Sequence, residues 1–269
     1  EYALITMDRS PNQSLIVDSL RLGVISLSDG TISDLGIVGT NAHYVRTGHI
    51  VFGRSGGMVF AAPFSLSKRA VTGPAVLLME GVWQGTGGAT DFAVSDNGTL
   101  VFHTGTLSSG AVSELVIVDR AGLPRTVPGG SMPAIHARIS PDGKRIAATL
   151  SASATPLSGN LTLIDAATGA RQRLADANAG AQAEWTRDGT RVLFLRQEGT
   201  VTEIVSRAWD RSGADLLLAR DSTRRLFEVA PGAARGPAAI RGYVGAARAI
   251  FLAPAESLGA LRLLHETRA

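Results

Sequence analysis

The chain has 269 residues, of which 45% are hydrophobic and 18% are charged, with a formal net charge of +3 at pH 7. This is enough apolar material for a large core, while the absence of cysteine excludes disulfides, thiolate catalysis and cysteine-ligated metal sites. No run of about 18 apolar residues occurs, so no transmembrane helix is predicted, and the few aromatic residues do not alternate with Arg, which argues against nucleic acid as a partner.

The predicted strands begin at residues 2–7 and 21–37, which we interpret as the later strands of an incomplete first unit. A strand, a glycine turn and a second strand then recur in YVRTGHIVF (44–52), SDNGTLVF (95–102), ARISPDGKRIAATL (137–150) and TRDGTRVLF (186–194). In the third copy Pro141 presets φ, Asp142 can bond its own backbone and Gly143 tolerates positive φ, which predicts a tight hairpin. The turn glycines, Gly48, Gly98, Gly143 and Gly189, are 50, 45 and 46 residues apart.

A second hairpin follows within each period, for example NLTLID (160–165) with ARQRLA (170–175). Four short strands in a period of this length are typical of a β-propeller blade. The sequence therefore predicts an all-β, single-domain β-propeller of six four-stranded blades, or of five. The approximate blades are 1–39, 40–84, 85–130, 131–177, 178–222 and a degenerate last one, 223–269. We also expect the two ends of the chain to share a blade, with residues 265–269 or the segment just before them against the blade that holds residues 2–7, because open sheet edges would be pairing hazards.

Alignment of the copies on their turn glycines gives two informative columns. The residues four positions before the glycine are bulky and are expected to pack blade against blade: Tyr44, Val94, Ile139 and Trp185. The residues seven positions before it are polar and are expected at the mouth of a central channel: Asn41, Asp91, His136 and Gln182. This second column predicts a binding pocket, with satisfied polar groups beside water as the alternative interpretation.

The catalytic alternatives find little support in the sequence. The five histidines show no metal-binding spacing, and no G-x-S-x-G elbow is present. Asp96, Asp142 and Asp188 lie in turns of separate copies, where turn chemistry already accounts for a carboxylate. We therefore predict a protein that is not an enzyme, with no cofactor and no metal.

The C-terminal part is basic, because residues 207–269 carry ten Arg against six acidic residues. An anionic partner or membrane surface could contact this flank, with Arg224 and Arg225 as the candidate residues. Scattered, solvated arginines are the alternative interpretation, because no block of like charges occurs.

The repeated Ser/Thr-x-Asp-Gly turns, as in SPDGKRIA and TRDGTRVLF, resemble those of TolB-like or WD-repeat-like bacterial β-propellers. Residues 44–82 and the stretch DFAVSDNGTLVF resemble more narrowly the extracytoplasmic propeller of receptor-type serine/threonine kinases, although no kinase motif is present. The resemblance implies a binding module for a protein partner, located in the periplasm or outside the cytoplasm and peripheral to the membrane. It would serve as a sensor domain or as an extrinsic scaffold subunit, for example of a respiratory or photosynthetic membrane complex. An enzyme acting on a small substrate at the channel mouth is the alternative.

Overall fold

The structure is a computed structural model that describes residues 1–8, 19–85, 89–104, 114–130, 134–150, 159–177, 183–231, 238–244, 247–253 and 259–266. Within these ranges the regular structure consists of β-strands, and no α-helix is formed. No helix in this described part is long and apolar enough to cross a membrane. The all-β prediction is confirmed.

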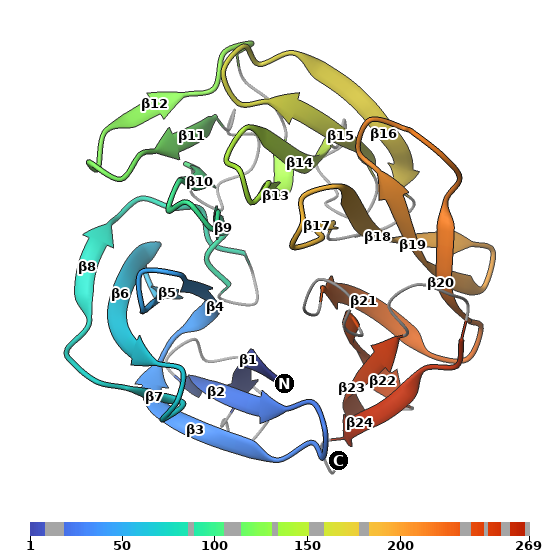
Figure 1. Cartoon of the computed structure of the whole chain (residues 1–269), viewed down its shortest axis with the longest axis horizontal. Helices are drawn as coiled ribbons and strands as arrows, with labels where there is room; N and C mark the ends of the chain where they lie inside the picture. Colours follow the sequence, from blue (N-terminus) through green and yellow to red (C-terminus); the bar gives the residue numbers. More distant parts are fainter. Residues whose placement is uncertain are drawn as a thin grey trace. The chain divides into compact units, whose positions relative to one another are not determined.

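The described strands form six antiparallel sheets that follow one another along the chain (Figure 1). Blade 1 contains β1 (Tyr2–Asp8), β2 (Leu20–Ser26) and β3 (Ile32–Val38), and blade 2 contains β4 (Thr40–Val45), β5 (His49–Arg54), β6 (Met58–Ser65), β7 (Ala70–Val71) and β8 (Val76–Met79). Blade 3 contains β9 (Phe92–Val94), β10 (Leu100–His103), β11 (Leu115–Val118) and β12 (Pro124–Thr126).

Blade 4 contains β13 (Ala134–Ile139), β14 (Arg145–Leu150), β15 (Gly159–Asp165) and β16 (Arg171–Ala177). Blade 5 contains β17 (Glu184–Trp185), β18 (Arg191–Glu198), β19 (Val201–Ala208) and β20 (Leu216–Asp221). Blade 6 contains β21 (Arg225–Ala230), β22 (Ala238–Val244), β23 (Ala247–Ala253) and β24 (Arg262–Glu266). In blade 2 the fourth position is shared by β7 and β8, which both pair with β6. The fold is a six-bladed β-propeller, as predicted, and the five-blade alternative is wrong.

The chain divides into two compact units, Glu1–Met132 with blades 1 to 3 and Pro133–Ala269 with blades 4 to 6. The first unit has apolar clusters that include the buried rings of Phe52 and Phe92. The second has a larger cluster that includes Trp185, Phe194 and Phe251. That the whole chain acts as one domain stays a prediction.

Several middle strands of the blades, such as β2, β14 and β19, are buried along most of their length. In β14, for example, the four residues from Ile146 to Thr149 are all buried. A strand whose two faces are both covered reads as a continuous apolar run rather than as an alternating pattern. This explains why the sequence shows short, unbroken apolar segments between its glycine turns.

The predicted bulky column is confirmed only in part. Trp185 is 5% exposed and packs in the large cluster of the second unit, and Ile139 is also buried. Tyr44 and Val94 are only partly buried, and the ring of Tyr44 makes an edge contact with Phe64 of its own blade. The column therefore contributes to blade packing to different degrees in different blades.

The expectation that the two ends of the chain share a blade is wrong for the strands that the structure describes. β1 pairs with β2 over seven residue pairs, whereas β24 pairs with β23. Blade 1 has three described strands, and blade 6 obtains its fourth strand from its own segment. Each terminal sheet is therefore built from local hairpins, which close with less loop entropy than a pairing across the whole chain.

Candidate functional site

The repeated turns use their polar side chains to hold the hairpins together. In blade 4 the Asp142 carboxylate accepts a hydrogen bond from the Ser140 hydroxyl and another, at 3.1 Å, from the Lys144 amide. Asp188 makes the same pair of contacts in blade 5, with Thr186 and Thr190. Turn chemistry thus accounts for these two carboxylates.

The prediction that turn chemistry also accounts for Asp96 is wrong, because Asp96 makes none of these turn hydrogen bonds. The equivalent of Asp142 in blade 3 is Asn97, whose side-chain oxygen accepts hydrogen bonds from the Ser95 hydroxyl and the Thr99 amide. Asp96 instead forms an ion pair with Arg46, at 2.9 Å. The sequence offset arose because SDNG and SPDG place their acidic residues at different distances from glycine.

Two members of the predicted polar column share an unusual backbone conformation. Asn41 and His136 have φ values of 51° and 53°, in the left-handed region that non-glycine residues seldom adopt. In both of these blades, 2 and 4, the register of the first two strands shifts at this place, between Thr40 and His43 and between Ile135 and Arg138. The column thus marks a repeated β-bulge, a feature that redirects side chains at the sheet rim.

Asn41 uses its side chain to connect blade 2 to the start of blade 3. Its amide Nδ2 donates to the carbonyl oxygens of Thr90 and Phe92, at 3.0 and 3.1 Å. The His43 ring lies 3.1 Å from the Asn41 Oδ1 and makes an edge contact with Phe92. These contacts give Asn41 a structural role between neighbouring blades.

The other members of the column are placed separately. Asp91 is buried, and its amide donates to the carbonyl oxygen of Trp83. Asp91 and Asn41 belong to the first unit and His136 to the second, while Gln182 lies outside the described residues. A common pocket formed by the four residues therefore stays a prediction.

Arg224 lies between β20 of blade 5 and β21 of blade 6 and contacts residues of both blades. Its guanidinium forms an ion pair with the buried Asp221 carboxylate and lies 5.0 Å from the centre of the Phe251 ring. Burial alone would raise the pKa of Asp221, but hydrogen bonds from the backbone and side chains of Thr223 and Arg224 outweigh it and lower the pKa. Arg225 lies at the start of β21, opposite Tyr243. A contact of this pair with an anionic partner stays a prediction.

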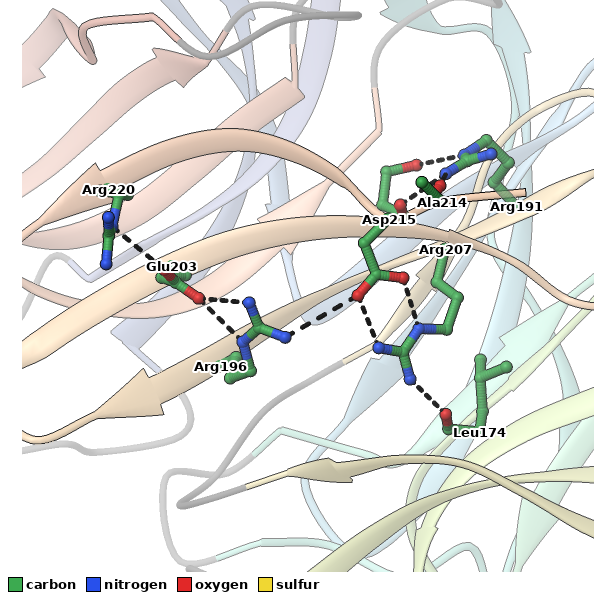
Figure 2. A network of polar contacts seen from close by, with 9 residues as sticks. Leu174, Arg191, Arg196, Glu203, Arg207, Ala214, Asp215 and Arg220 are labelled. Carbon is green, nitrogen blue, oxygen red and sulfur yellow. Dashed lines mark hydrogen bonds and ion pairs between the residues drawn. The ribbon is translucent and has the colours of Figure 1, made fainter. Parts of the chain in front are cut away.

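A ladder of alternating charges crosses blade 5 (Figure 2). The Glu203 carboxylate of β19 accepts a hydrogen bond of 2.8 Å from Arg196 of β18 and forms an ion pair of 3.0 Å with Arg220 of β20. Both arginines lie opposite Glu203 in the sheet register. Arg207 clasps Asp215 with two hydrogen bonds, of 2.7 and 2.6 Å. The sequence signal was available, because the hairpin turn at Gly199 sets Arg196 against Glu203.

A cleft of about 440 Å³ adjoins this ladder, between β16 of blade 4 and the strands of blade 5. Its lining residues are Arg173, Leu174, Ala175, Phe194, Arg196, Arg207 and Arg211. Four of these seven residues are arginines, and none of the described lining residues is acidic. The sequence analysis missed this site because its members come from segments that only the packing of two blades brings together.

The outer edge of blade 2 is apolar. Val76, Leu77 and Leu78 of β8 are 61%, 43% and 48% exposed. The outer strands of the other blades each contain at least one charged residue, whereas residues 70–79, which span β7 and β8, contain none. In the described part of the chain β8 pairs with β6 alone, so its other edge offers backbone groups to a further strand.

No protein-family model matches the sequence, and a search of the curated proteins gives no match. The structure is similar to TolB from Acinetobacter baumannii, with a TM-score of 0.63 and 14% identity over 96% of this chain and 65% of that one. A protein of Agrobacterium tumefaciens described as TolB gives a TM-score of 0.69 and 14% identity over 91% of this chain and 87% of that one. The chain has the fold of the TolB-like β-propellers. It spans less than two thirds of the Acinetobacter protein.

The structure is also similar to that of an enzyme. An oligogalacturonate lyase in complex with manganese gives a TM-score of 0.58 and 10% identity, over 87% of this chain and 67% of that one. In the described part of this chain, no group of three or more His, Asp or Glu is placed to hold a metal ion. Because a propeller can carry either a binding surface or an active site, the fold is compatible with protein binding and does not decide the activity.

Proposed function

We propose that this TolB-like propeller is a non-catalytic protein-binding module and that the open edge of β8 receives an extended strand of its protein partner. The observation that carries the proposal is the exposure of three consecutive apolar residues, Val76 to Leu78, on an edge strand without charge. Proteins usually protect such edges with charged residues, proline or a covering element. An exposed apolar edge marks either an interaction site or an aggregation hazard.

Strand addition fits this edge physically. A partner strand would obtain main-chain hydrogen bonds from β8, and successive side chains of the partner would meet both faces of the blade. Because the chain carries a net charge of +3, a neutral or acidic partner strand is favoured over a second copy of the same chain. The blade would hold β8 in a fixed position for the partner strand to pair with.

The resemblance to TolB-like propellers supports an extracytoplasmic location, peripheral to the membrane. In that setting the module would act as the sensor part of a receptor or as an extrinsic scaffold of a membrane complex. Neither role requires catalysis, a metal or nucleic acid. The two roles differ in the partner, which is a diffusing signal protein for the sensor and a resident membrane protein for the scaffold.

The proposal is tested by capturing the partner from membranes with the purified chain and identifying it by crosslinking. Leu77→Lys and Leu78→Lys place a charge on the edge and should abolish capture, whereas Leu123→Lys should leave it intact. Leu123 is a matched control, because it is 65% exposed and lies beside β12 of blade 3. Equal capture by all variants would disprove the β8 edge as the contact. A dimer that Leu78→Lys dissociates would replace the partner strand with a second copy.

A further inference from the structure

Four arginines line the cleft beside blade 5, namely Arg173, Arg196, Arg207 and Arg211. Arg196 forms an ion pair with Glu203 and Arg207 with Asp215, and Glu203 also pairs with Arg220 outside the cleft. Four cationic side chains gathered at one cleft attract a small anion.

The guanidiniums are held in place before any ligand binds. Asp215 fixes Arg207 through two hydrogen bonds, and Arg207 also donates to the Leu174 carbonyl oxygen of the neighbouring blade. Glu203 fixes Arg196, whose Nη1 lies 3.8 Å from Asp215. Such clamping lowers the side-chain entropy that binding would otherwise remove.

Arg211 is the member with the fewest commitments. It donates one hydrogen bond to the Arg173 carbonyl oxygen and has no carboxylate partner among the described residues. Its backbone has φ = 61°, a conformation in which glycine or asparagine is usual. A non-glycine residue held there carries local strain, and such strain often accompanies binding sites.

Asp215 and Arg207 stay charged over the physiological range. The hydrogen bond from Arg207, opposed by burial, lowers the pKa of Asp215, and the Asp215 contact raises that of Arg207. The ring of Phe194 also lines the cleft, with its centre 5.5 Å from the guanidinium carbon of Arg207. The buried ring, together with Leu174 and Ala175, gives the cleft an apolar base beneath a cationic rim.

We propose that this cleft binds a small organic oxyanion, of the phosphomonoester or dicarboxylate class, independently of the protein partner at β8. Guanidinium groups recognise both kinds of oxyanion through paired N–H donors. The cleft volume of about 440 Å³ lies in the range of small-ligand sites. Rim arginines from blades 4 and 5 would close on one ligand and tie the two blades together.

The test titrates the purified full chain with phenyl phosphate and with phthalate, using phenol as a neutral control. Binding is followed by calorimetry and by NMR of the arginine Nε–H groups. Both anions should bind saturably and phenol should not. The signals of Arg196, Arg207 and Arg211 should shift more than that of Arg187, an exposed arginine on the turn before β18. Arg173→Gln and Arg211→Gln should each weaken binding about tenfold.

Arg187→Gln is the matched control, because it removes the same charge outside the cleft. Its affinity should equal that of the wild type. Equal weakening of anion binding by all three variants would show that only the overall charge of the protein matters and would overturn the proposal. Binding that does not saturate and that shifts the signals of every arginine would also overturn it. Vesicles containing phosphatidylglycerol form a separate arm. The protein could sediment with these vesicles in a way that depends on Arg173 and Arg211, while the soluble anions do not bind. That result would identify a lipid phosphate, in place of a small soluble anion, as the ligand.

Discussion

The indole Nε1 of Trp185 donates a hydrogen bond of 3.0 Å to the carbonyl oxygen of Arg138. The two residues lie in the first strands of blades 5 and 4. The Arg138 guanidinium returns across the same boundary to the Glu184 carboxylate. One hydrogen bond and one ion pair therefore join the same two strands, and both are largely shielded from water.

Trp185→Ala should lower the free energy of unfolding by about 3–5 kcal/mol, because it removes a buried ring and an inter-blade hydrogen bond. His136→Ala, at the partly exposed bulge of blade 4, should change it by less than about 1 kcal/mol. Urea unfolding followed by circular dichroism measures both. Similar losses in the two variants would show that the bulge, as well as the ring, determines stability.

Asp142→Asn should leave the turn intact near neutral pH, because Asn97 fills the equivalent position in blade 3. Burial would raise the pKa of Asp142, but the Ser140 and Lys144 hydrogen bonds lower it overall. The folded state therefore binds this proton less readily than the unfolded state. The resulting stability is complete above the unfolded pKa of about 3.9 and is lost as pH falls through the folded value.

The double variant Asp142→Asn and Asp188→Asn should consequently unfold with a shallower pH dependence between about pH 4 and pH 2 than the wild type. Asp188 has its pKa lowered in the same way, by Thr186 and Thr190 against the effect of burial. Unfolding midpoints measured across this range provide the comparison. An unchanged slope would mean that other carboxylates dominate acid unfolding.

Gly53→Ala should destabilise the first unit by about 1–3 kcal/mol. A Cβ added to Gly53 of β5 would lie 2.4 Å from the Cβ of Thr90, at the boundary with blade 3. Thr90→Gly removes the obstructing atom, so the double variant should be less destabilised than the sum of the single variants. Double-mutant unfolding measurements provide this coupling, and simple additivity would contradict the steric explanation.

Charge reversal should distinguish the roles of Arg224 and Arg225, the two basic residues at the start of β21. Arg224→Glu would set a second carboxylate beside Asp221 and should lower the melting temperature. Arg224→Glu combined with Arg225→Glu should weaken association with anionic vesicles or with the native partner, most strongly at low salt. Co-sedimentation at two ionic strengths checks this. Retention equal to wild type at both would remove the pair as a contact, and Arg225→Glu alone separates contact from stability.

The sequence by itself determined the blades, because their hairpins depend on contacts between near neighbours. Gly143, with φ = 73°, and the Ser140–Asp142 hydrogen bond form the same turn that the letters SPDG predict. The recurrence of that turn every 45 to 50 residues predicted a propeller of six blades, with five as the alternative. It also predicted that Asp96, Asp142 and Asp188 serve the turns, which is correct for Asp142 and Asp188, whereas Asn97 takes this role in place of Asp96.

Only the tertiary structure decided which side chains from different blades meet. The cleft combines Arg173 of β16 with Arg196 and Arg207 of the next blade, and no spacing in the sequence encodes that approach. The exposure of Leu78 likewise depends on the absence of a further strand beside β8 among the described residues, whereas an apolar run in the sequence usually indicates a buried strand. Local hydrogen bonds depend on residues that are neighbours in the sequence, but burial and charge clustering arise from the packing of sheets against one another.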